Sequence, residues 1–120
     1  MLEATSRLAK VDDLTWLRRK TRPKQSFDQE IRSVDLFSGC GGLSLGVQEA
    51  ARRMGLDHTV EMASELNPEI FNVFKKNFQP RFPLVGDIRD VFDGDLHDPK
   101  ITNTEKGLVD QNPGIMEPDI

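Results

Sequence analysis

A glycine-rich stretch directly after a short apolar run constrains the fold more than any other feature of this sequence. Residues 35–46 read DLFSGCGGLSLG, so four glycines fall within eight positions. The run IRSVDLF at 31–37 has the composition of a strand, and LSLGVQEAARRMG at 43–55 has that of a helix. A strand that passes into a helix through a glycine loop is typical of α/β domains that bind a ligand at that turn.

The same alternation of strand and helix continues along the chain. HTVEMAS at 58–64 and FPLVGD at 82–87 predict two further strands, and NPEIFNVFKKNF at 67–78 predicts a helix between them. Such an order is the signature of a right-handed parallel α/β unit, so we expect a partial Rossmann-like fold that stops before a fourth strand. The apolar faces expected of the two helices are Leu43, Val47, Ala50, Ala51 and Met54, and Ile70, Phe71, Phe74 and Phe78.

The chain divides into three segments by composition. Residues 1–30 predict a peripheral helix and linker, residues 31–92 the α/β unit, and residues 93–120 a polar loop or insertion that ends in PDI, the start of a next strand. We therefore expect the chain to stop in the middle of a fold. The apolar positions of the predicted N-terminal helix are Leu8, Val11, Leu14 and Leu17, with Trp16 as a packing anchor.

Length and composition exclude several classes of protein. The chain has 120 residues, of which 37% are hydrophobic, and no apolar stretch approaches the roughly 20 residues of a membrane span. The N-terminus has no secretory signal, and a single cysteine, Cys40, suits a reducing compartment. His58 and His97 are isolated, so we expect no metal. The expected location is intracellular, which means cytoplasmic, or nuclear in a eukaryote.

Charge is unevenly distributed along the chain. Residues 1–33 carry eight Lys/Arg and five Asp/Glu, a net of +3, whereas residues 34–120 carry eight and fifteen, a net of −7. The two values sum to the net charge of −4. A domain that binds nucleic acid unaided usually has a basic face, and here only a short basic run before residue 25, which we interpret as a solvated tail, fits that description.

Three simple interpretations of the glycine loop fit the residues poorly. A nucleophilic cysteine needs a base or an electropositive pocket, and neither histidine has a spacing that places it near Cys40. A phosphate-binding P-loop needs a lysine, which the loop lacks. A dinucleotide fingerprint needs G-x-G-x-x-G, and Ser44 stands where the third glycine belongs, so that match is partial.

The acidic residues at the predicted strand ends are more informative. Asp35, Glu65 and Asp87 belong to the three strands in order, and ligands of open parallel sheets bind at the carboxyl ends of strands. A carboxylate can accept hydrogen bonds from ribose hydroxyls or from an exocyclic amine, while Phe37 and Leu66 can sandwich a flat base. This pattern favours an adenosine-containing cofactor. The alternative is that each acid only caps the next helix or turn.

DLFSGCGGLSLG, followed by SELNP and then GDI, closely resembles the N-terminal third of the DNA cytosine-5 methyltransferase family over roughly residues 32–90. The resemblance implies an α/β fold that binds S-adenosylmethionine. It also implies that Glu65 holds the ribose hydroxyls, that Leu66 packs on the adenine where the family often has a larger side chain, and that Asp87 binds the adenine amine. The implied cofactor-binding set is Phe37, Ser38, Gly39, Cys40, Gly41, Gly42, Leu43, Glu65, Leu66, Asp87 and Ile88.

The resemblance also implies which functions lie outside this chain. The family's catalytic cysteine belongs to a Pro-Cys motif just after the fourth strand begins, and we expect no catalytic residue in 1–120. Methylation of DNA, for example in restriction-modification, would then need a second chain or the absent part, which would also contact the DNA. Three alternatives remain open: a nicotinamide- or flavin-binding oxidoreductase domain, a fragment of an RNA cytosine-5 methyltransferase, and a non-catalytic remnant.

Overall fold

A computed structural model of the chain describes residues 14–15, 18, 20 and 26–120. Most of the predicted N-terminal helix, including Trp16, lies outside the described residues. In the described part of the chain, no helix is long and apolar enough to cross a membrane.

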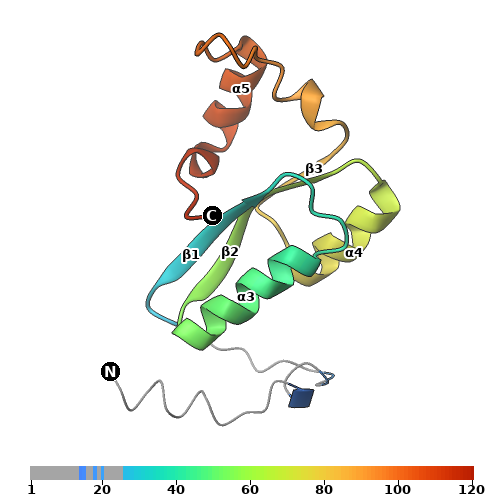
Figure 1. Cartoon of the computed structure of the whole chain (residues 1–120), viewed down its shortest axis with the longest axis vertical. Coiled ribbons are helices and arrows are strands. Elements are labelled where there is room, and N and C mark those ends of the chain that lie inside the picture. The colour runs from blue at the N-terminus through green and yellow to red at the C-terminus, as the bar shows by residue number, and fades with distance from the viewer. Residues whose placement is uncertain (1–13, 16–17, 19, 21–25) are drawn as a thin grey trace.

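The described residues form one parallel sheet of three strands, in the order β1-β2-β3 (Figure 1). The strands are β1 (Glu30–Asp35), β2 (Asp57–Glu65) and β3 (Phe82–Val85). β1 and β2 pair with a shift of register after Ser33, which accommodates one extra residue of β2. The predicted strands and their parallel arrangement are confirmed.

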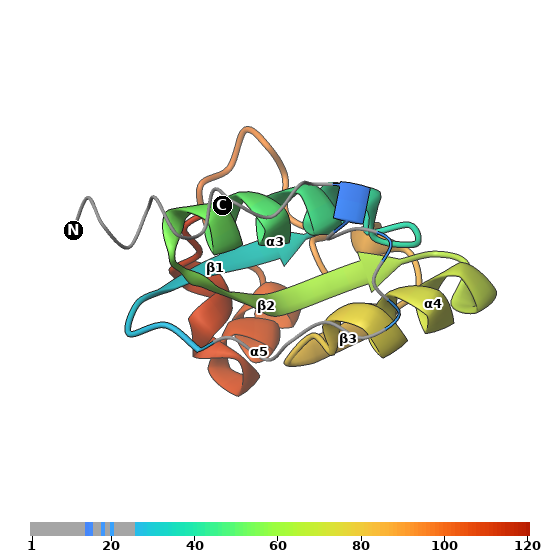
Figure 2. The ribbon, with the colours of Figure 1, turned by 90° about the horizontal axis from the view of Figure 1, so that it is seen from below.

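Two helices connect the strands, as the sequence predicts: α3 (Gly42–Met54) and α4 (Pro68–Phe78). α3 ends at Gly55, which has a φ of +72°, and α4 begins after Asn67, whose side chain accepts hydrogen bonds from the N–H groups of the first turn. Both crossovers step the same way across the sheet, so right-handed connections place both helices on one face. Figure 2 shows α3 running along β1 and β2.

The core lies between α4 and the sheet. Phe71 and Phe74 are fully buried and pack with Val60 and Ala63 of β2, and Phe78 packs against this cluster. The ring centroids of Phe74 and Phe78 are 4.8 Å apart. The predicted apolar face of α4 is therefore confirmed for these phenylalanines, whereas Ile70 remains 42% exposed.

The predicted apolar face of α3 is only partly confirmed, because Ala51 is buried but most of the other predicted residues are not. Leu43 and Met54 are 77% and 72% exposed, and the buried residues of this helix are Ser44, Ala51 and Arg52. Ser44 turns inward because its hydroxyl donates to Asp35 Oδ2 at 2.8 Å, and the Arg52 guanidinium is satisfied by Glu49 at 3.0 Å, so polar side chains can occupy the buried face. Apolar periodicity alone could not reveal these polar partners.

The segment predicted as a polar loop or insertion, residues 93–120, contains a helix, α5 (Asn103–Gln111), and a 3₁₀ turn, η2 (Pro113–Met116). Another 3₁₀ turn, η1 (Ile88–Asp90), precedes it. α5 begins with a capping box, in which Thr102 and Glu105 satisfy each other's backbone N–H groups. Figure 1 shows α5 on the opposite side of the strands from α3.

The last two residues lie alongside β1, on the edge opposite β2. Asp119 N and Ile120 N donate to the Arg32 carbonyl at 2.8 and 3.1 Å, and Val34 N donates to the Ile120 carbonyl at 2.9 Å. These bonds agree with the expectation that PDI leads towards a strand, although the sheet of the described residues contains only three strands.

Candidate functional site

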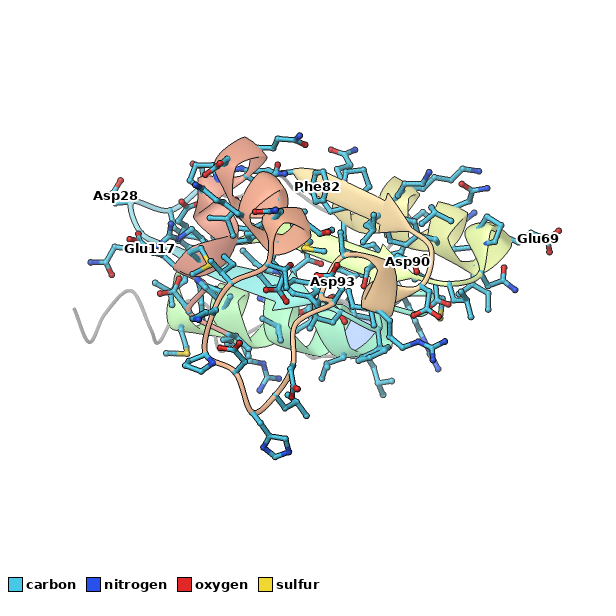
Figure 3. The ribbon with its side chains drawn as sticks, turned by 90° about the horizontal axis from the view of Figure 1, so that it is seen from above. Asp28, Glu69, Phe82, Asp90, Asp93 and Glu117 are labelled. Carbon is cyan, nitrogen blue, oxygen red and sulfur yellow. The ribbon has the colours of Figure 1, made fainter. Side chains whose placement is uncertain are left out.

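The carboxyl ends of the three strands meet at one edge of the sheet. Asp35 ends β1, Glu65 ends β2, and Asp87 follows β3 by two positions. Figure 3 shows Asp28, just before β1, and Glu69, at the start of α4, at opposite ends of the molecule. The glycine loop follows the end of β1 directly, so it lies at the edge where ligands of open parallel sheets bind.

The glycine loop is fixed to the end of β2 by hydrogen bonds. Ser38 N donates to the Ser64 carbonyl at 2.9 Å, and the Ser64 hydroxyl donates to the Leu36 carbonyl. Gly41 N donates to the Ser38 carbonyl at 3.0 Å, which closes a turn before α3 begins. The loop is thus held by β2 as well as by its own strand.

Two glycines of the loop meet different surroundings. Gly41 has a φ of +104°, and a Cβ there would lie 2.3 Å from Phe78 Cε2, so α4 packs too closely for any side chain. Gly39 has a φ of +52°, and a Cβ there would meet no atom within 4 Å. The backbone at Gly39 is therefore open to an approaching molecule.

Glu65 joins the loop to the first turn after β2. Its Oε2 accepts from Gly39 N and its Oε1 accepts from Asn67 N, both at 3.0 Å. The hydrogen bond from the Asn67 N–H, followed by those from Gly39 and Leu66, lowers the pKa of the Glu65 carboxyl against a smaller opposing effect of desolvation. The side chain is therefore an anionic acceptor at neutral pH.

Asp87 caps η1 and pairs with Arg89. Arg89 N donates to Asp87 Oδ1 at 2.9 Å, and the guanidinium donates from Nε to both oxygens at 3.0 Å and from Nη2 to Oδ2 at 2.5 Å. These hydrogen bonds from the Arg89 side chain are the main cause that lowers the pKa of Asp87 to about 2.

A pocket of about 360 Å³ opens between the strand ends. Phe37 and Leu66 are 79% and 67% exposed, so this rim offers apolar surface next to two carboxylates. Apolar walls with a few placed polar groups are the usual composition of a small-molecule site. The residues that line the pocket are Leu36, Phe37, Glu65, Leu66, Gly86, Asp87, Ile88 and Arg89.

The structure brings together only part of the predicted site. Five predicted residues share the 360 Å³ pocket: Phe37, Glu65, Leu66, Asp87 and Ile88. Cys40, Gly41 and Gly42 instead line a second pocket of about 410 Å³, with Leu45, Gln48, Asn77 and Phe78. Ser38 is buried, Gly39 bonds to Glu65, and Leu43 is exposed and lines neither of these two pockets.

The structure adds three residues that the sequence did not indicate. Leu36 precedes Phe37, and Gly86 has a φ of +146° and donates its N–H to the Glu65 carbonyl at 3.1 Å. Arg89 is the third, and its only signal in the sequence is a basic residue two positions after a carboxylate.

His58 lies near the amino end of β2, away from the edge where the strands end. His58 Nε2 lies 2.8 Å from Ser33 Oγ, between β1 and β2, and burial lowers the pKa of the imidazole. Within residues 14–15, 18, 20 and 26–120, no group of three or more His, Cys, Asp or Glu side chains could hold a metal ion.

Comparison with known families agrees with this geometry. The profile described as C-5 cytosine-specific DNA methylase matches residues 31–104, more than half of the chain, and includes all three strand ends and the glycine loop. The chain therefore belongs to the C-5 cytosine-specific DNA methylase family. The α/β fold with its parallel sheet is consistent with part of a methyltransferase fold.

Individual relatives include bacterial and plant methyltransferases. The type II methyltransferase M1.BsuMI of Bacillus subtilis (strain 168) is 43% identical over 100 residues, which cover 82% of this chain and 23% of that protein. The type II methyltransferase M.NlaIV of Neisseria lactamica is 34% identical over 58% of this chain and 16% of its own length. DNA (cytosine-5)-methyltransferase CMT2 of Arabidopsis thaliana is 37% identical over 45% of this chain.

The match thus spans less than a quarter of the length of these relatives. No solved structure matches the chain.

Proposed function

We propose that this chain is the N-terminal, S-adenosylmethionine-binding part of a DNA (cytosine-5-)-methyltransferase, which transfers a methyl group to C5 of cytosine in DNA. One observation carries the proposal: residues at or just after the ends of all three strands line a single pocket of about 360 Å³. The 3.0 Å bond from Gly39 N to Glu65 connects the loop and the second strand end directly.

The residues of the pocket fit the chemistry of an adenosine group. Backbone N–H groups occupy only part of the roughly four lone-pair sites of the Glu65 carboxylate, so it can still accept from a ribose hydroxyl. Phe37, Leu66 and Ile88 offer apolar surface for adenine, and the Asp87 carboxylate is an acceptor for its amine. When bound, the cofactor supplies an activated methyl group.

The remaining predicted residues belong to the loop beside the pocket. Gly39 leaves open backbone, which suits close approach by the ligand, whereas Gly41 is small because Phe78 packs against it. We retain the whole segment in the proposed cofactor-binding set: Ser38, Gly39, Cys40, Gly41, Gly42 and Leu43.

The proposed substrate is cytosine in DNA, and the proposed setting is an intracellular one, such as bacterial restriction-modification. Two matching relatives are named type II methyltransferases, and the plant relative is named a DNA (cytosine-5)-methyltransferase. Residues 1–120 contain no Pro-Cys dipeptide, so the catalytic thiolate and the DNA contacts would come from residues outside this sequence or from a second chain.

No specific observation favours either of the two alternative enzymes, an oxidoreductase domain or an RNA cytosine-5 methyltransferase. A nicotinamide- or flavin-binding oxidoreductase would share the glycine loop and Glu65, but the family match is to a DNA methylase. A methylation assay of this chain together with the missing catalytic part, given either DNA or RNA, distinguishes the two substrates.

Binding calorimetry with variants of Glu65 tests the proposal. Glu65→Ala removes the acceptor for the ribose hydroxyls, so the affinity for S-adenosylhomocysteine should fall about ten- to hundredfold. Glu69→Ala is the matched control, because it removes an exposed carboxylate of the α4 first turn that does not line the pocket. Equal losses in both variants, or a preference for NADH in the unsubstituted chain, would contradict the proposal.

A further inference from the structure

Arg89 takes up most of the acceptor capacity of Asp87 in an ion pair at the wall of the 360 Å³ pocket. A carboxylate has about four lone-pair sites for hydrogen bonds. Oδ1 accepts from Arg89 N at 2.9 Å and from Arg89 Nε at 3.0 Å. Oδ2 accepts from Arg89 Nε at 3.0 Å and from Nη2 at 2.5 Å. Three N–H groups of Arg89 therefore take up most of the acceptor sites, with the Nε–H shared between both oxygens, so an incoming amine would compete with them.

Of these donors, only the guanidinium can move without changing the fold. The Arg89 N–H belongs to the turn of η1, where Asp87 is the capping residue. The Arg89 side chain is 85% exposed, whereas the Asp87 side chain is 29% exposed. An exposed ion pair of this kind is weak and screened by salt, so the arginine can leave while the carboxylate stays at the pocket wall.

We propose that Arg89 is a built-in competitor for the adenine site: its guanidinium occupies Asp87 in the free protein and must be displaced when an adenine amine binds. This inference rests on the proposed function, because it assigns the competing group to the same pocket. Arg89 and Asp87 both line that pocket, so the displaced side chain leaves from the place that the ligand enters.

The competition has a consequence for affinity that a purely structural arginine would not have. Removing the guanidinium frees Asp87 in advance, so binding no longer includes the cost of breaking an ion pair. The expected gain in affinity for S-adenosylhomocysteine is about two- to fivefold, the range of an exposed ion pair. If Arg89 instead positioned Asp87 for the ligand, its removal would weaken binding.

Calorimetry on three proteins tests the competition: the unsubstituted chain, Arg89→Ala, and Lys106→Ala as a control that removes one exposed positive charge from α5. Arg89→Ala should bind S-adenosylhomocysteine two- to fivefold more tightly, and Lys106→Ala should bind like the unsubstituted chain. Equal or weaker binding by Arg89→Ala, with normal binding by the unsubstituted chain, overturns the inference and leaves the proposed function intact. No binding by any of the three contradicts both.

Salt provides an independent measurement. Adenosine is uncharged, so salt acts mainly on the ion pair that it must displace. Raising NaCl from about 20 mM to about 500 mM should tighten adenosine binding to the unsubstituted chain and leave binding to Arg89→Ala nearly unchanged. The Arg89 Nε–H signal in an NMR spectrum should shift when adenosine saturates the site. Parallel salt profiles, or an Arg89 signal that adenosine does not move, would contradict displacement.

Discussion

Two glycines near the start of α3 differ in what surrounds them, and the difference can be measured. In Gly41→Ala, the new methyl group would lie 2.3 Å from Phe78 Cε2 at a φ of +104°. Overpacking and a left-handed backbone together should destabilise the fold by about 2–4 kcal/mol, as measured by urea unfolding.

Gly46→Ala is the matched control, because Gly46 lies inside α3 and a Cβ there meets no atom within 4 Å. It should stabilise the protein by about 0.5–1 kcal/mol, since alanine is the better helix former. Equal effects of the two substitutions would show that the contact of the loop with α4 does not explain Gly41.

The ion pair of Asp87 predicts a loss of stability in acid. Its folded pKa of about 2 lies below the ordinary value of 3.8, so its contribution is complete above about pH 4 and is lost as the pH falls towards 2. The urea midpoint of the unsubstituted chain should therefore fall more steeply over that range than that of Asp87→Asn. Other carboxyls with lowered pKa values, such as Glu65 and Asp93, are common to both proteins. Parallel curves would contradict the ion pair in solution.

At the scale of elements, the start of α4 depends on one side chain. Asn67 Oδ1 accepts from Glu69 N at 2.9 Å and from Ile70 N at 3.2 Å. Asn67→Ala should cost about 1 kcal/mol in urea unfolding, whereas Asn67→Asp should keep most of the stability. Asn72→Ala, an exposed change inside the same helix, should stay within about 0.5 kcal/mol. A cost for Asn72→Ala as large as that for Asn67→Ala would show that the cap is not the cause.

The elements of the central unit could be predicted because their local signals agree with each other. β1, β2 and β3 are short segments that contain apolar or β-branched residues and end at carboxylates or before a glycine, and α4 has both a capping asparagine and a proline in its first turn. The polar part of the buried face of α3 could not be predicted from apolar spacing. Ser44 turns inward towards Asp35 of β1, and Arg52 pairs with Glu49 one turn earlier in the same helix.

α5 could have been predicted from its T-x-x-E capping signal. The sequence around Thr102 and Glu105 carries the two residues of a capping box, but the polar composition of residues 93–120 obscured it. The weak apolar face of this helix, in which only Leu108 is buried, removed the second signal. The polar composition of this segment indicated a loop, whereas the capping motif indicated the start of a helix.

At the scale of the whole molecule, the strand ends could be predicted to meet, but the division of the site could not. Glu65 and Asp87 reach one pocket because parallel strands end at the same edge. Cys40, Gly41 and Gly42 face a second pocket, since the loop turns towards α4 before α3 begins. Which side of a glycine loop faces a ligand depends on this turn, which the letters G-C-G-G do not determine.

The 120-residue polypeptide should not methylate DNA by itself. It contains no Pro-Cys dipeptide, and the residues aligned with M1.BsuMI cover 23% of that protein. A filter assay with labelled S-adenosylmethionine and duplex DNA should give no signal above a blank without protein. Methyl transfer by the pure polypeptide would contradict the assignment of catalysis to residues outside this sequence.

The most direct test of the proposed cofactor site is to map the binding of S-adenosylhomocysteine on the amide signals of the isotopically labelled chain. The backbone signals of Gly39, Leu66 and Ile88 should shift and saturate together, because these residues lie at the three strand ends. Signals of α5, such as Leu108, should not move. Saturable shifts confined to α5 or to the 410 Å³ pocket, or no shifts at all, would contradict a cofactor site at the strand ends.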